Sequence, residues 1–198
     1  MTNPLERLVR VLARLPGIGR RTAERIAMRL AYRADDLLSE LTSAMGEVKE
    51  KVGLCSLCGA VTTVDVNPCS LCVDNRRDQS VLCVVEDPGD VTALELAGGF
   101  TGRYHVLMGK ISPMSGKGPW DLRLKELVER IDREQCRELV LALNTNTESD
   151  ATVAFIRDLL KGRQVKITRL ALGLPVGSGV SYSDPVTLER AMRGRQAV

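Results

Sequence analysis

With 198 residues, 44% of them hydrophobic and 27% charged, the chain is long enough for one full core plus small modules. No apolar run approaches the roughly 18 residues of a membrane span, and aromatic residues, at 3%, are too few for nucleic-acid binding on a platform of exposed rings. The net charge of +3 is asymmetric, because residues 1–33 carry eight arginines against two glutamates and the remainder carries −3. This asymmetry predicts an anionic partner at the N-terminal end.

The first predicted elements are two helices joined by a glycine-containing hairpin. Asn3-Pro4-Leu5-Glu6 predicts a helix start, with Asn3 as N-cap, Pro4 at the first helical position and Glu6 closing a capping box. Apolar residues at helical spacing continue this helix to Leu15, where Pro16-Gly17-Ile18-Gly19 should end it. A second helix is expected to begin within residues 20–22 and to run to about Tyr32.

The hairpin and the second helix form a candidate phosphate-binding site. Gly17 and Gly19 let the backbone approach a phosphate closely, and the amides that open the next helix at Arg20 carry partial positive charge. Along that helix, arginines recur every four residues and could follow neighbouring phosphates. They are Arg21, Arg25, Arg29 and Arg33. The alternative is a plain turn between two core helices with a solvated arginine face.

A third helix, capped by Asp35-Asp36, should lead to a four-cysteine motif. Cys55 and Cys58 form one Cys-x-x-Cys pair, and Cys69 and Cys72 form a second after ten intervening residues. This spacing can place four thiolates around one Zn²⁺, and a closed set of four cysteines is typical of a structural site. One alternative is a pair of disulfides, but nothing else in the sequence indicates an oxidising compartment. The other is four unrelated core thiols, which would not explain the repeated Cys-x-x-Cys spacing.

From residue 80 the pattern changes to alternating strands and helices, which predicts a parallel sheet with helices on both faces. The expected strands are 81–85, 104–108, 138–143 and 164–171, and the expected helices are 87–96, 122–131, 151–161 and 186–193. Residues 173–179 are expected to form a glycine-rich loop or arm. The fold class is therefore α/β, with an N-terminal helical module and a small metal-binding module. The metal-binding module, built on Cys55, Cys58, Cys69 and Cys72, is called the cysteine knot below; the name implies no disulfide.

Acidic residues follow two of these predicted strands. Glu86 follows the first, and Glu148 and Asp150 follow the third, where functional groups of a parallel sheet collect. These carboxylates could bind Mg²⁺, or could form an exposed cluster that docks a basic partner surface. Helix capping is the alternative role for these acidic residues: Asp87 and Asp90 would begin one helix, and Ser149 or Asp150 would begin the next, although capping does not explain Glu86. No catalytic residue is predicted, because the only histidine, His105, falls inside a strand and is expected in the core.

The order of these parts resembles the RecR family of bacterial recombination mediators over essentially the whole chain. The resemblance is carried by residues 15–19, 55–72, 84–91, 104–118 and 173–177. It implies an N-terminal helix-hairpin-helix module over 1–53, a four-cysteine zinc finger over 54–77, a Toprim domain over 78–166 and a C-terminal strand or arm with a short helix over 167–198. It also implies a non-enzymatic, cytoplasmic, nucleoid-associated protein with no membrane partner.

The resemblance further implies partners and site residues. Single- and double-stranded DNA would be bound without sequence preference, with Arg21 and Arg25 at the family's basic contact positions. RecO, and in some bacteria RecF, would dock at Glu86, Asp90 and Glu148, so that RecA is loaded onto strands coated by single-strand-binding protein. A homodimer or ring-like homotetramer is expected.

Two other functions compete with this interpretation. One is a Toprim-class nuclease or primase-like enzyme that uses Glu86, Glu148 and Asp150 with Mg²⁺. The other is a zinc-ribbon protein that binds RNA or acts as a scaffold. The family usually has Asn-Pro where this chain has Asn144-Thr145, which leaves the geometry of the acidic loop open.

Overall fold

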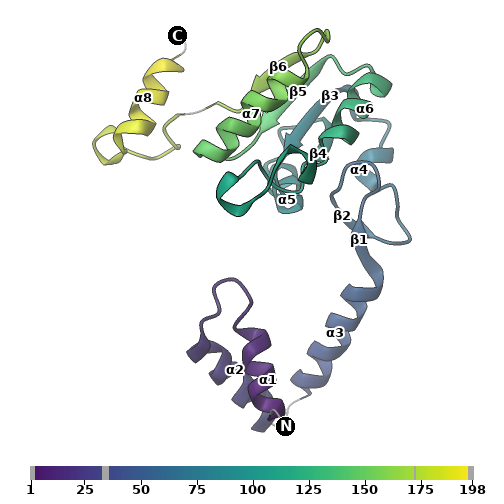
Figure 1. The fold of residues 1–198 in the computed structure, drawn as a ribbon, viewed down its shortest axis with the longest axis vertical. Helices are drawn as coiled ribbons and strands as arrows, with labels where there is room; N and C mark the ends of the chain where they lie inside the picture. Colours follow the sequence, from purple (N-terminus) through teal and green to yellow (C-terminus); the bar gives the residue numbers. More distant parts are fainter. Residues whose placement is uncertain (1–2, 33–35, 172, 196–198) are drawn as a thin grey trace. The chain divides into compact units, whose positions relative to one another are not determined.

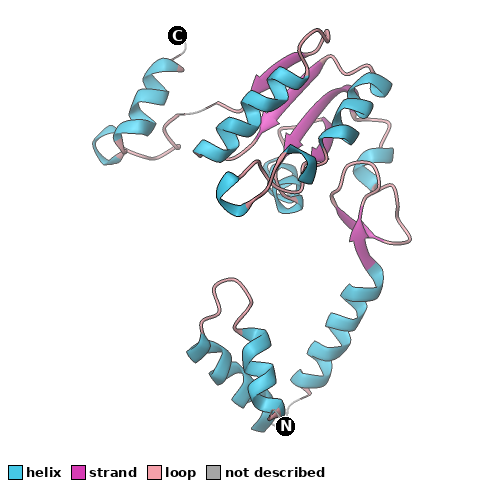
Figure 2. Cartoon of the chain, viewed as in Figure 1, coloured by secondary structure: helices cyan, strands magenta, loops and turns pink. Residues whose placement is uncertain are grey.

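The computed structural model describes residues 3–32, 36–171 and 173–195, and its helices and strands are drawn in Figures 1 and 2. The chain forms two compact units, Met1–Val52 and Gly53–Val198. The first unit contains helices α1 (Pro4–Leu12), α2 (Arg20–Tyr32) and α3 (Leu37–Lys51). Among the described residues, no helix has the length and apolar character needed to cross a membrane.

Helices α1 and α2 flank the predicted hairpin. Asn3 caps α1 by accepting a hydrogen bond from the backbone N–H of Leu5 at 3.0 Å. The expected continuation of α1 to Leu15 is wrong: the helix ends at Leu12, and the backbone N–H of Leu15 bonds to the Leu12 carbonyl in a tighter turn. This early end is reasonable because the residue before Pro16 is disfavoured in the helical conformation.

The second unit is built on a four-stranded parallel sheet with the order β4-β3-β5-β6. Its strands are β3 (Asp78–Val85), β4 (Gly102–Val106), β5 (Glu138–Ala142) and β6 (Lys166–Arg169). Its helices are α4 (Ser70–Val73), α5 (Pro88–Ala97), α6 (Leu124–Glu134), α7 (Thr147–Leu159) and α8 (Pro185–Arg193). A small two-stranded sheet, β1 (Val52–Leu54) and β2 (Val61–Thr63), precedes them.

Both faces of the sheet are covered, as predicted from the alternating pattern. Along β3, Leu82 and Val84 face one core, which they share with apolar residues of α6 and α7. The intervening Cys83 and Val85 face a second core, which contains the four cysteines and Val91 of α5. The strand alternation thus places the cysteine knot on one face of the sheet and two helices on the other.

The free edge of β4 is covered by groups from outside the sheet. Arg77 donates to the carbonyl of Gly102 at 2.9 Å, and Arg130 donates to the carbonyl of Tyr104. The backbone N–H of Val106 donates to the carbonyl of Cys58 at 2.7 Å. This last bond fixes the cysteine knot to the sheet, and together the three bonds satisfy edge groups that would otherwise invite pairing with another strand.

Candidate functional site

The four predicted cysteines converge in the structure. All are buried, and their sulfur atoms lie within 4.8 Å of one another. The Sγ–Sγ distance is 3.9 Å between Cys55 and Cys72 and 3.5 Å between Cys58 and Cys69. A tetrahedral metal with bonds of about 2.3 Å to sulfur requires sulfur atoms roughly 3.8 Å apart, so the donor set fits such an ion.

Electrostatics also favour a cation among these sulfurs. The hydrogen bond to Cys69, together with burial, raises the pKa of the Cys58 thiol to about 12. Hydrogen bonds to Cys58 and Cys69, with burial, also hold the pKa of Cys72 far above its usual range. By contrast, the hydrogen bond with Cys58 lowers the pKa of Cys69. In the cluster alone Cys69 is therefore favoured as a thiolate and Cys58 and Cys72 as thiols. A bound cation would stabilise the thiolate forms, as metal ligation requires.

Backbone groups and one arginine position the knot. The N–H of Ala60 points at the sulfur of Cys58 at 3.4 Å, and Gly59 before it has a φ of +80°, a conformation that favours glycine. Arg123 donates to the carbonyls of Ser56 and Leu57 at 3.3 and 3.2 Å. A side chain at position 59 would collide with the Arg123 guanidinium, so the glycine and the arginine form one packed unit.

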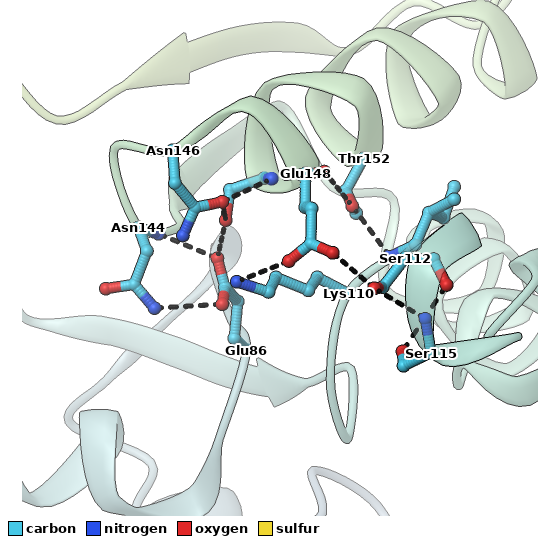
Figure 3. A network of polar contacts seen from close by, with 10 residues as sticks. Glu86, Lys110, Ser112, Ser115, Asn144, Asn146, Glu148 and Thr152 are labelled. Carbon is cyan, nitrogen blue, oxygen red and sulfur yellow. Dashed lines mark hydrogen bonds and ion pairs between the residues drawn. The ribbon is translucent and has the colours of Figure 1, made fainter.

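Glu86 connects the three segments that meet at the carboxyl end of the sheet (Figure 3). Its carboxylate accepts hydrogen bonds from the N–H and the side-chain amide of Asn144, both at 2.8 Å, and from the Ser149 hydroxyl at 2.5 Å. Its carbonyl accepts from the N–H of Gly109 at 2.9 Å. The expectation that Glu86 belongs to an exposed cluster is wrong, because the residue is only 3% exposed and its carboxylate orders two loops.

Glu148 lies beside Glu86 and has its own partners (Figure 3). Lys110 Nζ lies 3.0 Å from one carboxylate oxygen, and the Ser112 hydroxyl bonds to the other. The Ser112 and Lys110 contacts hold the pKa of Glu148 below its usual range. These groups border a shallow pocket of about 500 Å³ that carries charges of both signs, including Lys117. The surface is therefore a mixed patch rather than a purely acidic one.

Asp150 does not join Glu148. The predicted helix start at Ser149 or Asp150 is wrong: α7 begins at Thr147, and Asn146 caps it by accepting from the N–H of Ser149 at 2.9 Å. Residues two apart in a helix point to different sides. Asp150 instead pairs with Arg169 at 2.7 Å.

The carboxylates at this end of the sheet therefore do not converge on one point. Among the described residues, the four cysteines are the single group of three or more potential ligands close enough to hold an ion. Asp90 serves α5, because its carboxylate accepts a hydrogen bond from the N–H of Asp87 at 2.9 Å in a capping arrangement. The capping alternative is thus correct for Asp90.

In the N-terminal unit, the hairpin residues lie as the sequence predicts. Gly17 has a φ of +76°, and a Cβ added at either Gly17 or Gly19 would meet nothing within 4 Å. Arg20 is paired with Glu24 at 3.1 Å. The predicted contact arginines of α2 are all exposed; they are Arg21, Arg25 and Arg29. Arg33 and Asp35 lie outside the described residues.

Sequence reasoning missed Lys110, Ser112 and Arg123. The first two could have been found by the rule that already selected Glu86, because they follow the carboxyl end of the neighbouring strand β4. Arg123 carries no such signal: it precedes α6 and reaches carbonyl groups 66 and 67 positions earlier in the chain. His105 is fully buried, as expected.

Comparisons with known proteins agree with this arrangement. Three family models match: "RecR, helix-hairpin-helix" over residues 5–49, "Toprim domain" over residues 80–171 and "RecR, C-terminal" over residues 173–196. The chain is 47% identical to "Recombination protein RecR" of Sinorhizobium medicae over 199 aligned residues, covering 100% of this chain and 98% of that protein. The same name and coverage apply to relatives from Rhizobium etli, 48% identical, and Agrobacterium fabrum, 47% identical.

Proposed function

Because the chain belongs to the RecR family of recombination proteins, we propose that it is a DNA-binding mediator that acts with RecO, and with RecF, to load RecA onto single strands coated by single-strand-binding protein. Family membership gives it a role in recombinational DNA repair. The observation that carries the mediator proposal is the exposed hairpin with its arginine face.

DNA binding is supported by the chemistry of that hairpin. The backbone N–H groups in the first turn of α2 have no helical partners within α2, and they follow a glycine with open space around it. Arg21 and Arg25, one turn apart, are exposed on this helix. Backbone amides and guanidinium groups both recognise phosphate rather than bases, which suits binding without sequence preference to single- and double-stranded DNA.

We assign the ion at the cysteine knot as one structural Zn²⁺. A closed set of four buried thiolates suits Zn²⁺ and leaves no open position for a substrate. Cys55, Cys58, Cys69 and Cys72 would hold it. These cysteines share a buried core with β4, and the backbone hydrogen bond from Val106 to Cys58 ties them to that strand.

The patch formed by Lys110, Ser112 and Glu148 is proposed as the surface on which RecO docks. Asp90, in the first turn of α5, is proposed as a further docking residue. Glu86 contributes by holding the Asn144 loop and α7 in place. We propose no catalytic role for these carboxylates. The carboxylate of Glu86 accepts hydrogen bonds from Asn144 and Ser149, and Asp150 is paired with Arg169. Mg²⁺ binding by these carboxylates is accordingly not part of the proposed mechanism.

Self-association into a homodimer or a ring-like homotetramer is also proposed. Helix α3 exposes a row of apolar side chains, of which Met45 is 69% and Val48 is 58% exposed. The C-terminal arm exposes Val176 and Tyr182 in the same way. Exposed apolar rows of this kind are typical of surfaces that another copy of the chain covers. Light scattering across a dilution series measures the mass of the assembly in solution.

The DNA-binding proposal is tested by the variant Arg21→Ala/Arg25→Ala. Each lost phosphate contact lowers the slope of log affinity against log salt by about 0.9 on duplex DNA, so the slope should fall by about two units, equally for unrelated sequences. The measurement is fluorescence anisotropy with labelled duplexes at several NaCl concentrations.

The matched control removes two exposed positive charges from the other unit. In Arg76→Ala/Lys125→Ala the side chains removed are 91% and 87% exposed, and the slope should stay at the parental value. Equal slopes for the parent and Arg21→Ala/Arg25→Ala would contradict DNA contact at the hairpin.

A further inference from the structure

An open cleft in the Gly53–Val198 unit is lined by arginines from three elements. Arg157 comes from α7, Arg169 ends β6, and Arg190 and Arg193 come from α8, all around a space of about 620 Å³. We propose that this cleft, which will be called the arginine cleft, binds the phosphodiester backbone of single-stranded DNA as a second site, separate from the hairpin. The inference rests on the proposed DNA-binding function and adds a binding surface to it.

The charge of the arginine cleft is a local concentration. Residues 53–198 contain as many acidic as basic residues, so this unit has no net charge to distribute. The cleft nevertheless collects four guanidinium groups and one carboxylate, Asp150. Arginine stays protonated at all physiological pH values, so the excess positive charge is permanent and calls for an anionic ligand.

The carboxylate of Asp150 holds two of these groups side by side. Arg169 Nη1 lies 2.7 Å from one oxygen, and Arg190 Nη2 lies 3.5 Å from the other. Arg169 also donates to the carbonyl of Asn144 at 3.2 Å, and its Nε is buried without an acceptor among the described residues. The single carboxylate of Asp150 therefore orders the guanidinium groups of Arg169 and Arg190. This leaves one net positive charge held in place, with more N–H donors than acceptor oxygens around it.

The other two arginines lie at the rim. Arg157 is exposed and is absent from the ion pairs formed by the described residues, and Arg193 pairs only with Glu189 of its own helix, with both side chains largely exposed. An exposed pair within one helix is worth little, so Arg193 can exchange it for a phosphate at small cost. Guanidinium groups match phosphate oxygens in pairs, which makes phosphate the anion that suits this rim.

The floor and the openness of the cleft favour a strand over a small anion or a duplex. Val153, Ala154 and Leu170 supply the apolar part of the lining, which is called the floor here, and the cleft is too open to enclose a free phosphate. A single strand can place its backbone on the guanidinium rim and its unpaired bases on the apolar floor. A duplex has its bases paired and would use only the rim.

The test is Arg157→Ala/Arg193→Ala in the full-length protein, with labelled oligo(dT) followed by anisotropy across NaCl concentrations. For single strands each lost contact lowers the salt slope by about 0.7, so the slope should fall by about 1.4 units. Arg157→Lys/Arg193→Lys keeps both charges and should keep the slope, as should the control Arg76→Ala/Lys125→Ala. Circular dichroism and mass in solution establish that all variants have the parental fold and assembly.

The hairpin variant Arg21→Ala/Arg25→Ala, measured in parallel, separates this inference from the proposed function. A shallower dependence of log affinity on log salt in both double-alanine variants supports two sites. A shallower dependence only in Arg157→Ala/Arg193→Ala supports the cleft and contradicts the hairpin. Loss only in the hairpin variant would overturn the cleft. It would also be overturned if Arg157→Ala/Arg193→Ala kept full DNA binding and lost instead the binding of a labelled polyglutamate peptide, because the ligand would then be an acidic protein segment.

Discussion

His105 is buried in β4 in a surrounding that suits only its neutral form. Its Nε2 lies 2.8 Å from the carbonyl of Arg123 and must carry the proton, while Nδ1 has no partner among the described residues. Burial lowers the pKa of His105 from 6.5 to about 3, and the nearby Arg130 acts in the same direction. The unfolded chain therefore binds a proton in a pH range where the folded chain does not.

This difference predicts acid sensitivity. Below pH 6.5 the unfolded state takes up the proton, so the free energy of unfolding should fall as the pH falls, by about 1.2 kcal/mol between pH 6 and pH 5. His105 is the only histidine in the chain, so few other side chains titrate in this range. His105→Gln keeps a donor for the Arg123 carbonyl and should flatten the dependence.

The measurement is urea unfolding at pH 7, 6 and 5 with metal content checked at each pH. An identical pH dependence in the parent and in His105→Gln would show that another group controls it.

Glu86 shows how burial changes an expectation made from sequence. An exposed carboxylate would tolerate replacement by alanine, whereas Glu86→Ala leaves the N–H and amide of Asn144 and the hydroxyl of Ser149 without their acceptor. Unpaired buried donors cost about 1–3 kcal/mol each, and some will find water, so we expect a loss of about 2–4 kcal/mol in unfolding free energy.

The comparison that isolates this effect is Glu86→Gln, which keeps one acceptor oxygen and should lose about half as much. Urea unfolding gives the stabilities, and faster amide hydrogen exchange over residues 144–149 should accompany them. Parental stability in Glu86→Ala would contradict the role of Glu86 in ordering the loop.

Among the elements, the cysteine knot depends on the segment before α6. Arg123 donates to two carbonyls of the first Cys-x-x-Cys turn and packs against Gly59. Its positive charge lies beside a cluster that four thiolates and Zn²⁺ would leave with a charge of −2. Such outer contacts typically change metal affinity by about 10–100-fold.

Arg123→Ala should therefore release zinc to a chromogenic chelator about 10-fold faster than the parent, with the sheet still folded by circular dichroism. Lys125→Ala, two residues away and exposed, is the matched control. Equal release rates in Arg123→Ala and the parent would mean that the arginine does not support the metal site.

Much of the element pattern could be predicted because it depends on local signals. The strand β3 was visible as an apolar run, and the four cysteines by their spacing. The α7 boundary was missed because two candidate caps, Ser149 and Asp150, compete with Asn146 within four residues, and this shift separates Asp150 from Glu148. Contacts between distant residues, such as Arg123 with the knot, have no periodicity that a sequence pattern could reveal.

At the scale of the whole molecule, different parts of one chain carry different surfaces. Residues of the Met1–Val52 unit carry the exposed hairpin, and the Gly53–Val198 unit carries the metal knot, the mixed patch around Glu148 and the arginine cleft. In the proposed function, the hairpin and the arginine cleft bind DNA, the patch around Glu148 docks a protein partner, and the four cysteines hold a structural ion. A factor that loads a protein onto DNA needs the first two abilities.

The mediator function is measured by the rate at which RecA loads onto single-stranded DNA already coated by single-strand-binding protein, followed through RecA's DNA-dependent ATP hydrolysis in the presence of RecO. Adding the protein should shorten the lag before hydrolysis, and the DNA should remain intact in Mg²⁺. An unchanged lag, or Mg²⁺-dependent cleavage of the strand by the protein, would contradict the mediator function.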